Sequence, residues 1–285
     1  MKIKVHRHVK TAIKIALSLG ILGFVLYKID TKELLQVFGR VDWLYLIPAL
    51  FFFALSKFIA AFRLNRFLCA SGVKISNRFN LRLYMLGMFY NLFLPGGIGG
   101  DGYKIWLLNR RFAVKAKNIF WAILLDRVMG LLALFCLAAG LSAFIPIPAF
   151  YRNYTWLLIP LAVAAFYFFV RILFSKYLKI FFQTLGQSFL VQLSQVVSAL
   201  FILMSIGVFG EMYQYIFVFL LSSIVAAFPI TIGGIGSREI TFLFGAEMMN
   251  LDVSNSIALS LLFYLITALV SLTGIYYSIR DDKLK

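Results

Sequence analysis

The fold class is decided by the run Asn118-Ile-Phe-Trp-Ala-Ile-Leu-Leu-Asp-Arg-Val-Met-Gly-Leu-Leu-Ala-Leu-Phe-Cys-Leu-Ala-Ala-Gly-Leu-Ser-Ala-Phe144. Only Asp126 and Arg127 are charged in its 27 residues. As a helix it would extend about 40 Å, more than the roughly 30 Å hydrocarbon core of a bilayer. Because the apolar residues are continuous and do not alternate, the run predicts a transmembrane helix and excludes a transmembrane β-strand.

The composition of the whole chain agrees with this run. Of 285 residues, 62% are hydrophobic, 17% are aromatic and only 14% are charged. A soluble domain is nearer half apolar and a quarter charged, and a disordered chain needs low hydrophobicity. Both classes are therefore excluded. We expect an all-α polytopic membrane protein in which residues 1–285 form a single membrane domain.

Six apolar runs are long enough to span a bilayer. They are Thr11–Tyr27, Trp43–Phe62, Asn118–Phe144, Tyr154–Val170, Phe189–Phe209 and Ser256–Ile279. Two further runs, Leu83–Pro95 and Tyr215–Pro229, have only 13 and 15 residues and end at a proline beside a glycine cluster. Such short runs are typical of re-entrant segments. The sequence thus predicts six full transmembrane helices plus two re-entrant helical hairpins, about eight hydrophobic segments in all.

The net charge of +17 supports this topology. In a soluble protein it would suggest nucleic acid, but here the positive-inside rule accounts for it, and no nucleic-acid partner is expected. If both short runs return to their side of entry, five segments face the cytoplasm and hold 21 of the 28 lysines and arginines. These segments are 1–14, 63–82, 103–117, 171–187 and 280–285. We expect a plasma-membrane protein with both termini cytoplasmic.

The two short runs end in matching sequences. Pro95-Gly-Gly-Ile-Gly-Gly-Asp-Gly-Tyr-Lys104 and Pro229-Ile-Thr-Ile-Gly-Gly-Ile-Gly-Ser-Arg238 share six positions at a constant offset of 134 residues. Three predicted spans lie between them, so the second hairpin enters from the opposite face. This predicts an inverted repeat with halves of about 11–117 and 154–253, an arrangement typical of transporters with a site near the midplane.

The glycine clusters suggest how an anion would bind. A helix that restarts after such a cluster directs N–H groups and a positive dipole end into the membrane, and Lys104 or Arg238 would add charge. A lipid phosphate is the expected anion. The alternative is that the glycines only permit tight turns and close packing. Gly97 to Gly102 also fits G-x-G-x-x-G, but without the βαβ context of a dinucleotide site.

Charged residues inside the membrane are functional candidates by default. Asp126 and Arg127 lie near the midplane, and neighbours in sequence do not face each other on a helix, so we expect separate partners. Arg127 could contact a lipid phosphate or form a structural ion pair with Glu239. Lys57 is expected to snorkel to the cytoplasmic end of its span.

Other polar residues of the spans have two possible roles each. Arg63 and Arg66 are expected to bind headgroups or to orient their helix. Gln192 and Gln195 form a polar stripe that lines a groove or joins helices by hydrogen bonds. The two cysteines have no metal-ligand spacing, and both histidines lie in the N-terminal tail. We therefore expect no metal, no cofactor and no catalytic residue.

Three stretches together resemble the flippase-like integral membrane domain family, also known as the transmembrane region of lysylphosphatidylglycerol synthase. They are Asn91 to Lys104, Asp126 to Gly130 and Phe228 to Glu239. The resemblance implies a protein that moves or binds lipids between leaflets, with motifs at 91–104 and 229–239. Because the chain ends at Lys285, we expect a stand-alone member without the soluble synthase domain and without aminoacyl transfer.

From these arguments we expect a non-enzymatic lipid flippase for an anionic phospholipid or lipid-linked intermediate. The candidate headgroup-binding residues are Asn91, Pro95, Gly96, Gly99, Gly100, Asp101, Lys104, Asp126, Arg127, Pro229, Thr231, Gly233, Gly234, Gly236, Arg238 and Glu239. Gln192 and Gln195 are the candidate cavity-lining residues. The alternatives are a non-transporting partner of a separate lipid-modifying enzyme, or a membrane-embedded headgroup transferase using carboxylates as acid or base.

Overall fold

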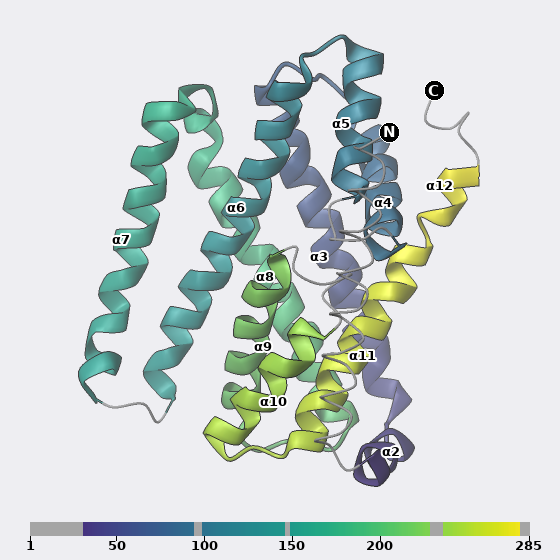
Figure 1. Cartoon of the computed structure of the whole chain (residues 1–285), viewed down its shortest axis with the longest axis vertical. Helices are drawn as coiled ribbons and strands as arrows, with labels where there is room; N and C mark the ends of the chain where they lie inside the picture. The colour runs from purple at the N-terminus through teal and green to yellow at the C-terminus, as the bar shows by residue number, and fades with distance from the viewer. Residues whose placement is uncertain (1–30, 94–98, 146–148, 229–235, 280–285) are drawn as a thin grey trace, which may run out of the picture.

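The computed structural model describes residues 31–93, 99–145, 149–228 and 236–279, and these ranges contain helices and turns but no strand. The α-helices are α2 (Thr31–Gly39), α3 (Trp43–Ala70), α4 (Asn77–Phe93), α5 (Gly99–Phe112), α6 (Ala116–Leu141), α7 (Ala149–Leu173), α8 (Phe181–Ser205), α9 (Met212–Ala227), α10 (Ser237–Met249), α11 (Val253–Leu272) and α12 (Ile275–Ile279). Two 3₁₀ helices, η1 (Ser142–Phe144) and η2 (Ser175–Ile180), border α7 (Figure 1). The predicted all-α class is confirmed.

Within the described residues, five helical stretches are long and apolar enough to cross a membrane. They are Trp43–Ala70, Ala116–Phe144, Tyr154–Leu173, Ser175–Ser205 and Val253–Ile279. Each corresponds to one predicted span, and the remaining predicted span, Thr11–Tyr27, lies outside the described residues. α3 continues past its predicted end at Phe62, because the arginine that follows is buried inside the bundle and does not mark the membrane surface.

Two pairs of shorter helices differ from the spans. α4 and α5 have 17 and 14 residues, and α9 and α10 have 16 and 13. At 1.5 Å per residue these helices extend about 20 to 26 Å, less than the hydrocarbon core. The members of each pair pack against each other. α4 and α5 lie in the upper half of Figure 1, and α9 and α10 lie in the lower half.

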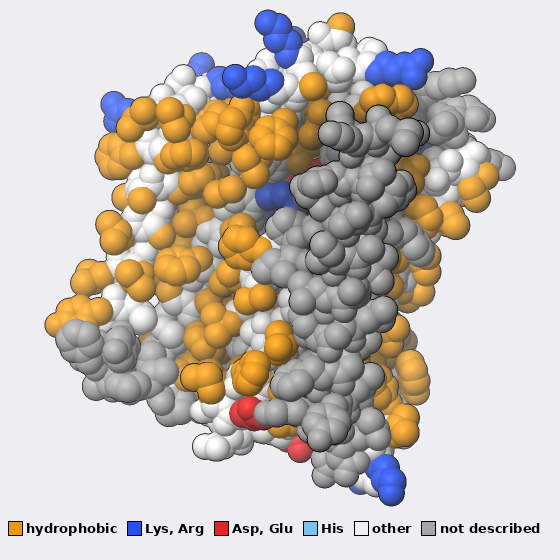
Figure 2. Space-filling view, in the orientation of Figure 1, with side chains coloured by type: hydrophobic (Ala, Val, Ile, Leu, Met, Phe, Trp, Pro, Cys, Tyr) orange, Lys and Arg blue, Asp and Glu red, His pale blue; other side chains and the backbone are white. Residues whose placement is uncertain are grey.

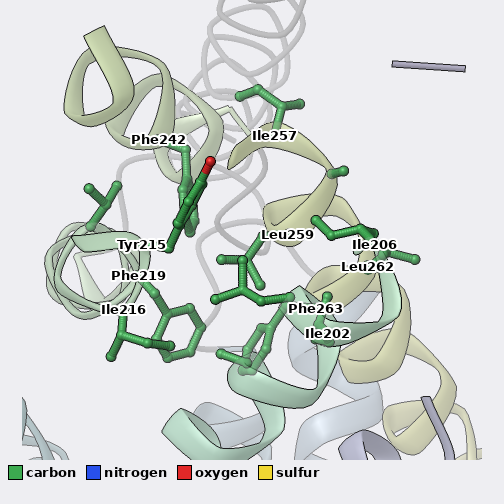
Figure 3. Packing of buried hydrophobic residues seen from close by; sticks show 14 of the residues in the cluster. Ile202, Ile206, Tyr215, Ile216, Phe219, Phe242, Ile257, Leu259, Leu262 and Phe263 are labelled. Carbon is green, nitrogen blue, oxygen red and sulfur yellow. The ribbon is translucent and has the colours of Figure 1, made fainter. Parts of the chain in front are cut away.

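The hydrophobic core consists of two clusters of buried side chains. One surrounds the α9–α10 pair and includes Phe219, Phe242 and Phe263, with contributions from α3, α8 and α11 (Figure 3). The other surrounds the α4–α5 pair and includes Leu83 and Leu108, with contributions from α3, α6, α7, α8 and η2. Each short helix pair therefore has its own apolar surroundings.

Polar side chains separate the two clusters. Along α3, one cluster ends at Phe53 and the other begins at Leu64. Along α8, the corresponding limits are Leu185 and Ala199. Seven polar or charged side chains, taken from these two intervals and from the charged pair of α6, form what we call the polar layer. They are Lys57, Arg63, Asp126, Arg127, Ser188, Gln192 and Gln195.

The two ends of the molecule differ in charge. Exposed lysines and arginines gather at the end where α5 leads into α6, which is the upper end in Figure 2. We call this the basic end. The exposed acids Asp42, Glu211, Glu247 and Asp252 lie at helix termini in the lower half of Figure 1. Asp42 and Asp252 accept hydrogen bonds from the backbone N–H groups of Leu44 and Asn255, which stabilises the first turns of α3 and α11.

The α4–α5 pair depends on a close approach of two glycines. A Cβ atom built on Gly100 would collide with the backbone carbonyl of Gly87. Backbone atoms of a packed helix cannot move aside as the end of a flexible side chain can. Gly100 and Gly87 therefore allow α5 to lie directly against α4.

We predict that Gly100→Ala destabilises the protein by about 1–3 kcal/mol, because the added methyl group overpacks the helix contact. Thermal unfolding in detergent would measure the loss. Gly102→Ala is the matched control, since Gly102 lies on the same helix and a Cβ atom there meets nothing within 4 Å. A glycine-to-alanine change at such a helical position is neutral or stabilising. Equal midpoints for the two variants would contradict the proposed contact.

Candidate functional site

The centre of the polar layer is an ion pair between α3 and α6. Arg63 Nε donates to Asp126 Oδ1 at 2.7 Å, and Arg63 Nη2 donates to Oδ2 at 3.3 Å. Arg63 Nη1 donates to Ser188 Oγ of α8 at 2.7 Å. Both charged side chains are buried, at 6% and 9% exposure. Three spans are thus joined by one guanidinium. Of the two roles expected for Arg63, these contacts support orientation of its helix, and its assignment to the cytoplasmic segment 63–82 is wrong because Asp126 holds it in the interior.

A second charged cluster joins α5 to α6. Asp101 Oδ1 accepts from Lys104 Nζ at 3.1 Å, and Asp101 Oδ2 accepts from Arg127 Nε at 2.5 Å. The Lys104 ammonium also lies 4.7 Å from the ring centroid of Tyr84 on α4. Lys104 is therefore buried and does not belong with the cytoplasmic cations counted from the sequence. As expected, Asp126 and Arg127 have separate partners, but the suggested Arg127–Glu239 pair is not the one that forms.

Asn91 and Glu239 bind backbone N–H groups at the starts of α5 and α10. Asn91 Oδ1 accepts from the N–H of Gly100 at 2.8 Å. Glu239 Oε2 accepts from the N–H of Gly236 at 2.6 Å, and Glu239 Oε1 accepts from Ser260 Oγ of α11 at 2.9 Å. These two N–H groups are unavailable to a ligand, so the protein's own side chains complete part of the anion site predicted at each helix start.

Two interior cations rest on aromatic rings. The Arg238 guanidinium lies 4.9 Å from the centroid of Phe263 and 5.9 Å from that of Phe219. The Lys57 ammonium lies 4.4 Å from the centroid of Phe53, one turn earlier on α3. Lys57 thus extends away from the basic end, which contradicts the prediction that it snorkels there. A helical side chain leans toward the N-terminus of its helix, and the aromatic face stabilises the ammonium.

Two cavities adjoin the polar layer. One of about 210 Å³ is lined by the charged side chains of both clusters, together with Tyr84 and Asn91. The other, of about 380 Å³, is lined by Lys57, Gln192 and Gln195 among others. Arg63, Tyr84 and Arg127 line both. Arg127 is 33% exposed, far more than the other charged side chains of the two ion-pair clusters, so it is the one most accessible to a ligand.

The polar stripe of α8 both joins helices and lines a cavity, the two roles considered for it from the sequence. Gln192 Nε2 donates to the carbonyl of Gly130 on α6 at 3.2 Å, which joins the two helices, and Gln192 also lines the larger cavity. A Cβ atom at Gly130 would lie 3.4 Å from Arg63 Nη1 and 3.8 Å from Gln192 Nε2. Both side chains thus pack at ordinary contact distance beside this position of α6.

Several predicted site residues are thus brought together, and others are not. Asn91, Asp101, Lys104, Asp126 and Arg127 line one cavity. Gly99 and Gly100 begin α5, and Gly236 precedes α10. Arg238 and Glu239 lie on α10 and contact the aromatic and hydroxyl groups already described. Pro95, Gly96, Pro229, Thr231, Gly233 and Gly234 lie outside the described residues.

Sequence reasoning missed Tyr84 entirely and misplaced Arg63 and Lys57. A tyrosine in an aromatic-rich span carries no signal of its own. Arg63 did leave a signal in the sequence. Asp126 at mid-span requires a buried cation as partner, and Arg127 beside it cannot face it. Candidates for that cation were therefore limited to the few arginines and lysines of neighbouring spans.

The fold and the site define a polytopic helical membrane protein with a charged, cavity-lined centre. The chain belongs to the family described as the lysylphosphatidylglycerol synthase TM region, whose model matches residues 11–185 and 176–274. The resemblance found in the sequence motifs is confirmed. No curated protein matches the chain.

We predict that the Arg63–Asp126 pair is strongly coupled. Arg63→Met or Asp126→Leu alone leaves an unpaired charge in the interior and should cost about 3–5 kcal/mol of stability. The double variant removes both charges and should cost clearly less than the sum of the two. Thermal unfolding in detergent measures the cycle. Lys115→Met, which removes an exposed cation, should change stability by less than about 0.5 kcal/mol. Additive losses would contradict the pairing.

Proposed function

We propose that this protein translocates the headgroup of an anionic lipid between leaflets, while the acyl chains stay in the bilayer. One observation carries the proposal: the described interior holds more positive than negative charge. The cations are Lys57, Arg63, Lys104, Arg127 and Arg238. The carboxylates are Asp101, Asp126 and Glu239.

The distribution of the carboxylates sharpens this argument. Asp126 pairs with Arg63, Asp101 pairs with Lys104 and Arg127, and Glu239 caps its own helix. Lys57 and Arg238 lie over aromatic rings instead. A charge in the membrane interior is costly unless it is paired. An entering phosphate would supply the missing negative charge, and the cavities beside Lys57 and Arg127 would admit it.

We further propose that α4–α5 and α9–α10 are re-entrant hairpins that enter from opposite faces, as halves of an inverted repeat. Their shortness and the packing of the two helices of each pair against each other support this arrangement. With the span predicted at 11–27, six full spans result. The concentration of exposed lysines and arginines at one end supports a cytoplasmic basic end, and with it cytoplasmic termini in the plasma membrane.

In the proposed mechanism, Arg127 exchanges one anion for another. It bonds to Asp101 in this structure and lines both cavities. A headgroup phosphate replaces Asp101 as its partner, and Lys104 continues to neutralise the released carboxylate. Breaking the link between α5 and α6 frees the first hairpin to move. The headgroup then passes along the polar layer toward Lys57 and Arg238, and Arg63 with Asp126 holds the three spans together.

We predict that the purified protein exchanges fluorescent phosphatidylglycerol between the leaflets of liposomes. Dithionite should then quench more than half of the fluorescence, because lipid from the inner leaflet reaches the surface. Arg127→Ala and Arg238→Ala should reduce the exchange rate about tenfold or more, since a lost charge-assisted contact is worth about 1.5–3 kcal/mol. Lys115→Ala, an exposed cation of the basic end, is the control and should retain the wild-type rate.

The outcomes separate the possible roles. Cooperative thermal unfolding would first show that the protein is folded. If dithionite then quenches only half of the fluorescence with every lipid tested, translocation is contradicted and a non-transporting partner of a lipid-modifying enzyme is favoured. Excess quenching that neither arginine variant reduces would leave translocation standing and refute this site. Chemical turnover of the lipid, detected by mass spectrometry, would favour a headgroup transferase.

We predict that Lys57 contributes to the preference for anionic lipids. Lys57→Gln keeps a polar side chain of similar length but removes one positive charge from the larger cavity. The ratio of phosphatidylglycerol to phosphatidylcholine exchange should fall about three- to tenfold, with phosphatidylcholine exchange nearly unchanged. Competition between the two labelled lipids in one liposome preparation measures the ratio. A proportional loss of both activities would indicate a structural role for Lys57 instead.

A further inference from the structure

A third cavity, of about 430 Å³, lies at the basic end and apart from the polar layer. It is bounded by the end of α3, the first residue of α4 and the 3₁₀ helix η2. None of its lining residues borders the two interior cavities. Cations, asparagines and apolar side chains line it together, and the interior site gives them no role.

The local structure brings three cations to this cavity. Residues three apart in a 3₁₀ helix lie on the same face, so Lys176 and Lys179 both project from one side of η2. Between them, Tyr177 is 1% exposed and packs against Phe67 of α3, with ring centroids 5.8 Å apart. This contact fixes η2 against α3, and Arg66 of α3 lines the same cavity as the two lysines.

Asparagines connect the remaining sides. Asn65 Nδ2 donates to Asn77 Oδ1 at 2.6 Å and approaches the carbonyl of Ile75 at 3.4 Å. These bonds tie the end of α3 to the start of α4. The three elements that border the cavity are therefore fixed to one another by Asn65, Asn77 and Tyr177, and the exposed Lys176 and Lys179 extend from this frame.

The charges around this cavity are not balanced. In the described part of the chain, no carboxylate forms an ion pair with Arg66, Lys176 or Lys179. The Lys176 ammonium instead lies over the ring of Tyr177, 4.9 Å from its centroid. Three cations around one cavity repel each other, and an oxyanion between them would relieve that repulsion through charge-assisted hydrogen bonds.

The position of the cavity distinguishes a lipid from a free anion. Phe62, Ala70 and Ile180 supply apolar lining beside the cations. Next to η2, the end of α7 and the start of α8 expose Ile172, Leu173 and Phe182 by 76%, 62% and 69%. Large exposed apolar side chains at this level indicate contact with acyl chains, so the cations lie where the headgroups of that leaflet begin.

We propose that this cavity binds the phosphate of an anionic phospholipid from the leaflet at the basic end, separately from the translocation site. Arg66, Lys176 and Lys179 hold the phosphate, and Phe62 and Ile180 contact the glycerol and upper acyl chain. The inference does not depend on translocation, because it concerns other residues and a binding readout.

The chain supplies its own reporter for a test. Cys69 lines this cavity and is exposed, whereas Cys136, the other cysteine, is buried. In the Cys136→Ala protein, the labelling rate of Cys69 by N-ethylmaleimide can be measured in nanodiscs of phosphatidylcholine alone or mixed with phosphatidylglycerol. Labelling should slow about tenfold in the mixture, since lipid at ten times its Kd leaves about a tenth of the sites empty.

Matched variants separate this site from the general effect of an anionic surface. Lys176→Gln combined with Lys179→Gln should restore the rate seen in phosphatidylcholine alone. Lys115→Gln combined with Lys117→Gln removes the same charge from exposed positions of the same end and should keep the protection. Equal protection in both double variants, or equal wild-type rates in the two lipid mixtures, would overturn the proposal.

A soluble phosphate is the competing source of the same group. Inorganic phosphate or pyrophosphate, added to the protein in phosphatidylcholine nanodiscs, should leave the labelling rate unchanged, because neither supplies the apolar part of the contact. Protection by either compound that matches that of phosphatidylglycerol would refute the assignment to a lipid. If the liposome assay shows no lipid exchange but phosphatidylglycerol still protects Cys69, the result contradicts the proposed translocation and leaves this binding site standing.

Discussion

Hydrocarbon tolerates a charge only when another group of the protein satisfies it, and the Arg63–Asp126 pair is where this constraint organises the bundle. The pair joins α3 to α6, and a further bond from Arg63 reaches Ser188 of α8. Removing either partner would leave the other charged and buried, which costs far more than losing both.

The charged pairs also differ in how much of them is exposed. Arg63 and Asp126 are both almost fully buried, whereas Arg127 is partly exposed and borders two cavities. The proposed exchange of Asp101 for a phosphate rests on this access of Arg127 to the cavities. Lys57 and Arg238 rest on aromatic faces, and neither forms an ion pair with a carboxylate in the described part of the chain. At the basic end, Arg66, Lys176 and Lys179 extend the same excess of positive charge to the membrane surface.

The sequence predicted the helical class, five described spans and the two short helix pairs, because span length and apolar continuity are local properties of the chain. It also located four of the five charged residues around the smaller cavity, since a charge in or beside an apolar run is visible without a structure. It placed Lys57 and Arg63 wrongly, for one reason. Near the end of a span, a cation can either reach the headgroups or turn inward, and only the neighbouring helices decide which.

By itself, then, the sequence determined that the chain is a polytopic helical membrane protein, where its charges interrupt apolar runs, and that its two halves carry matching glycine motifs. Only the tertiary structure decided the partners: Asp126 with Arg63, Arg127 with Asp101, and Glu239 with Ser260. Those partners lie 63, 26 and 21 residues apart. Which of several cations reaches a given carboxylate depends on how helices pack and cross, and that information resides in contacts between segments and not in any one of them.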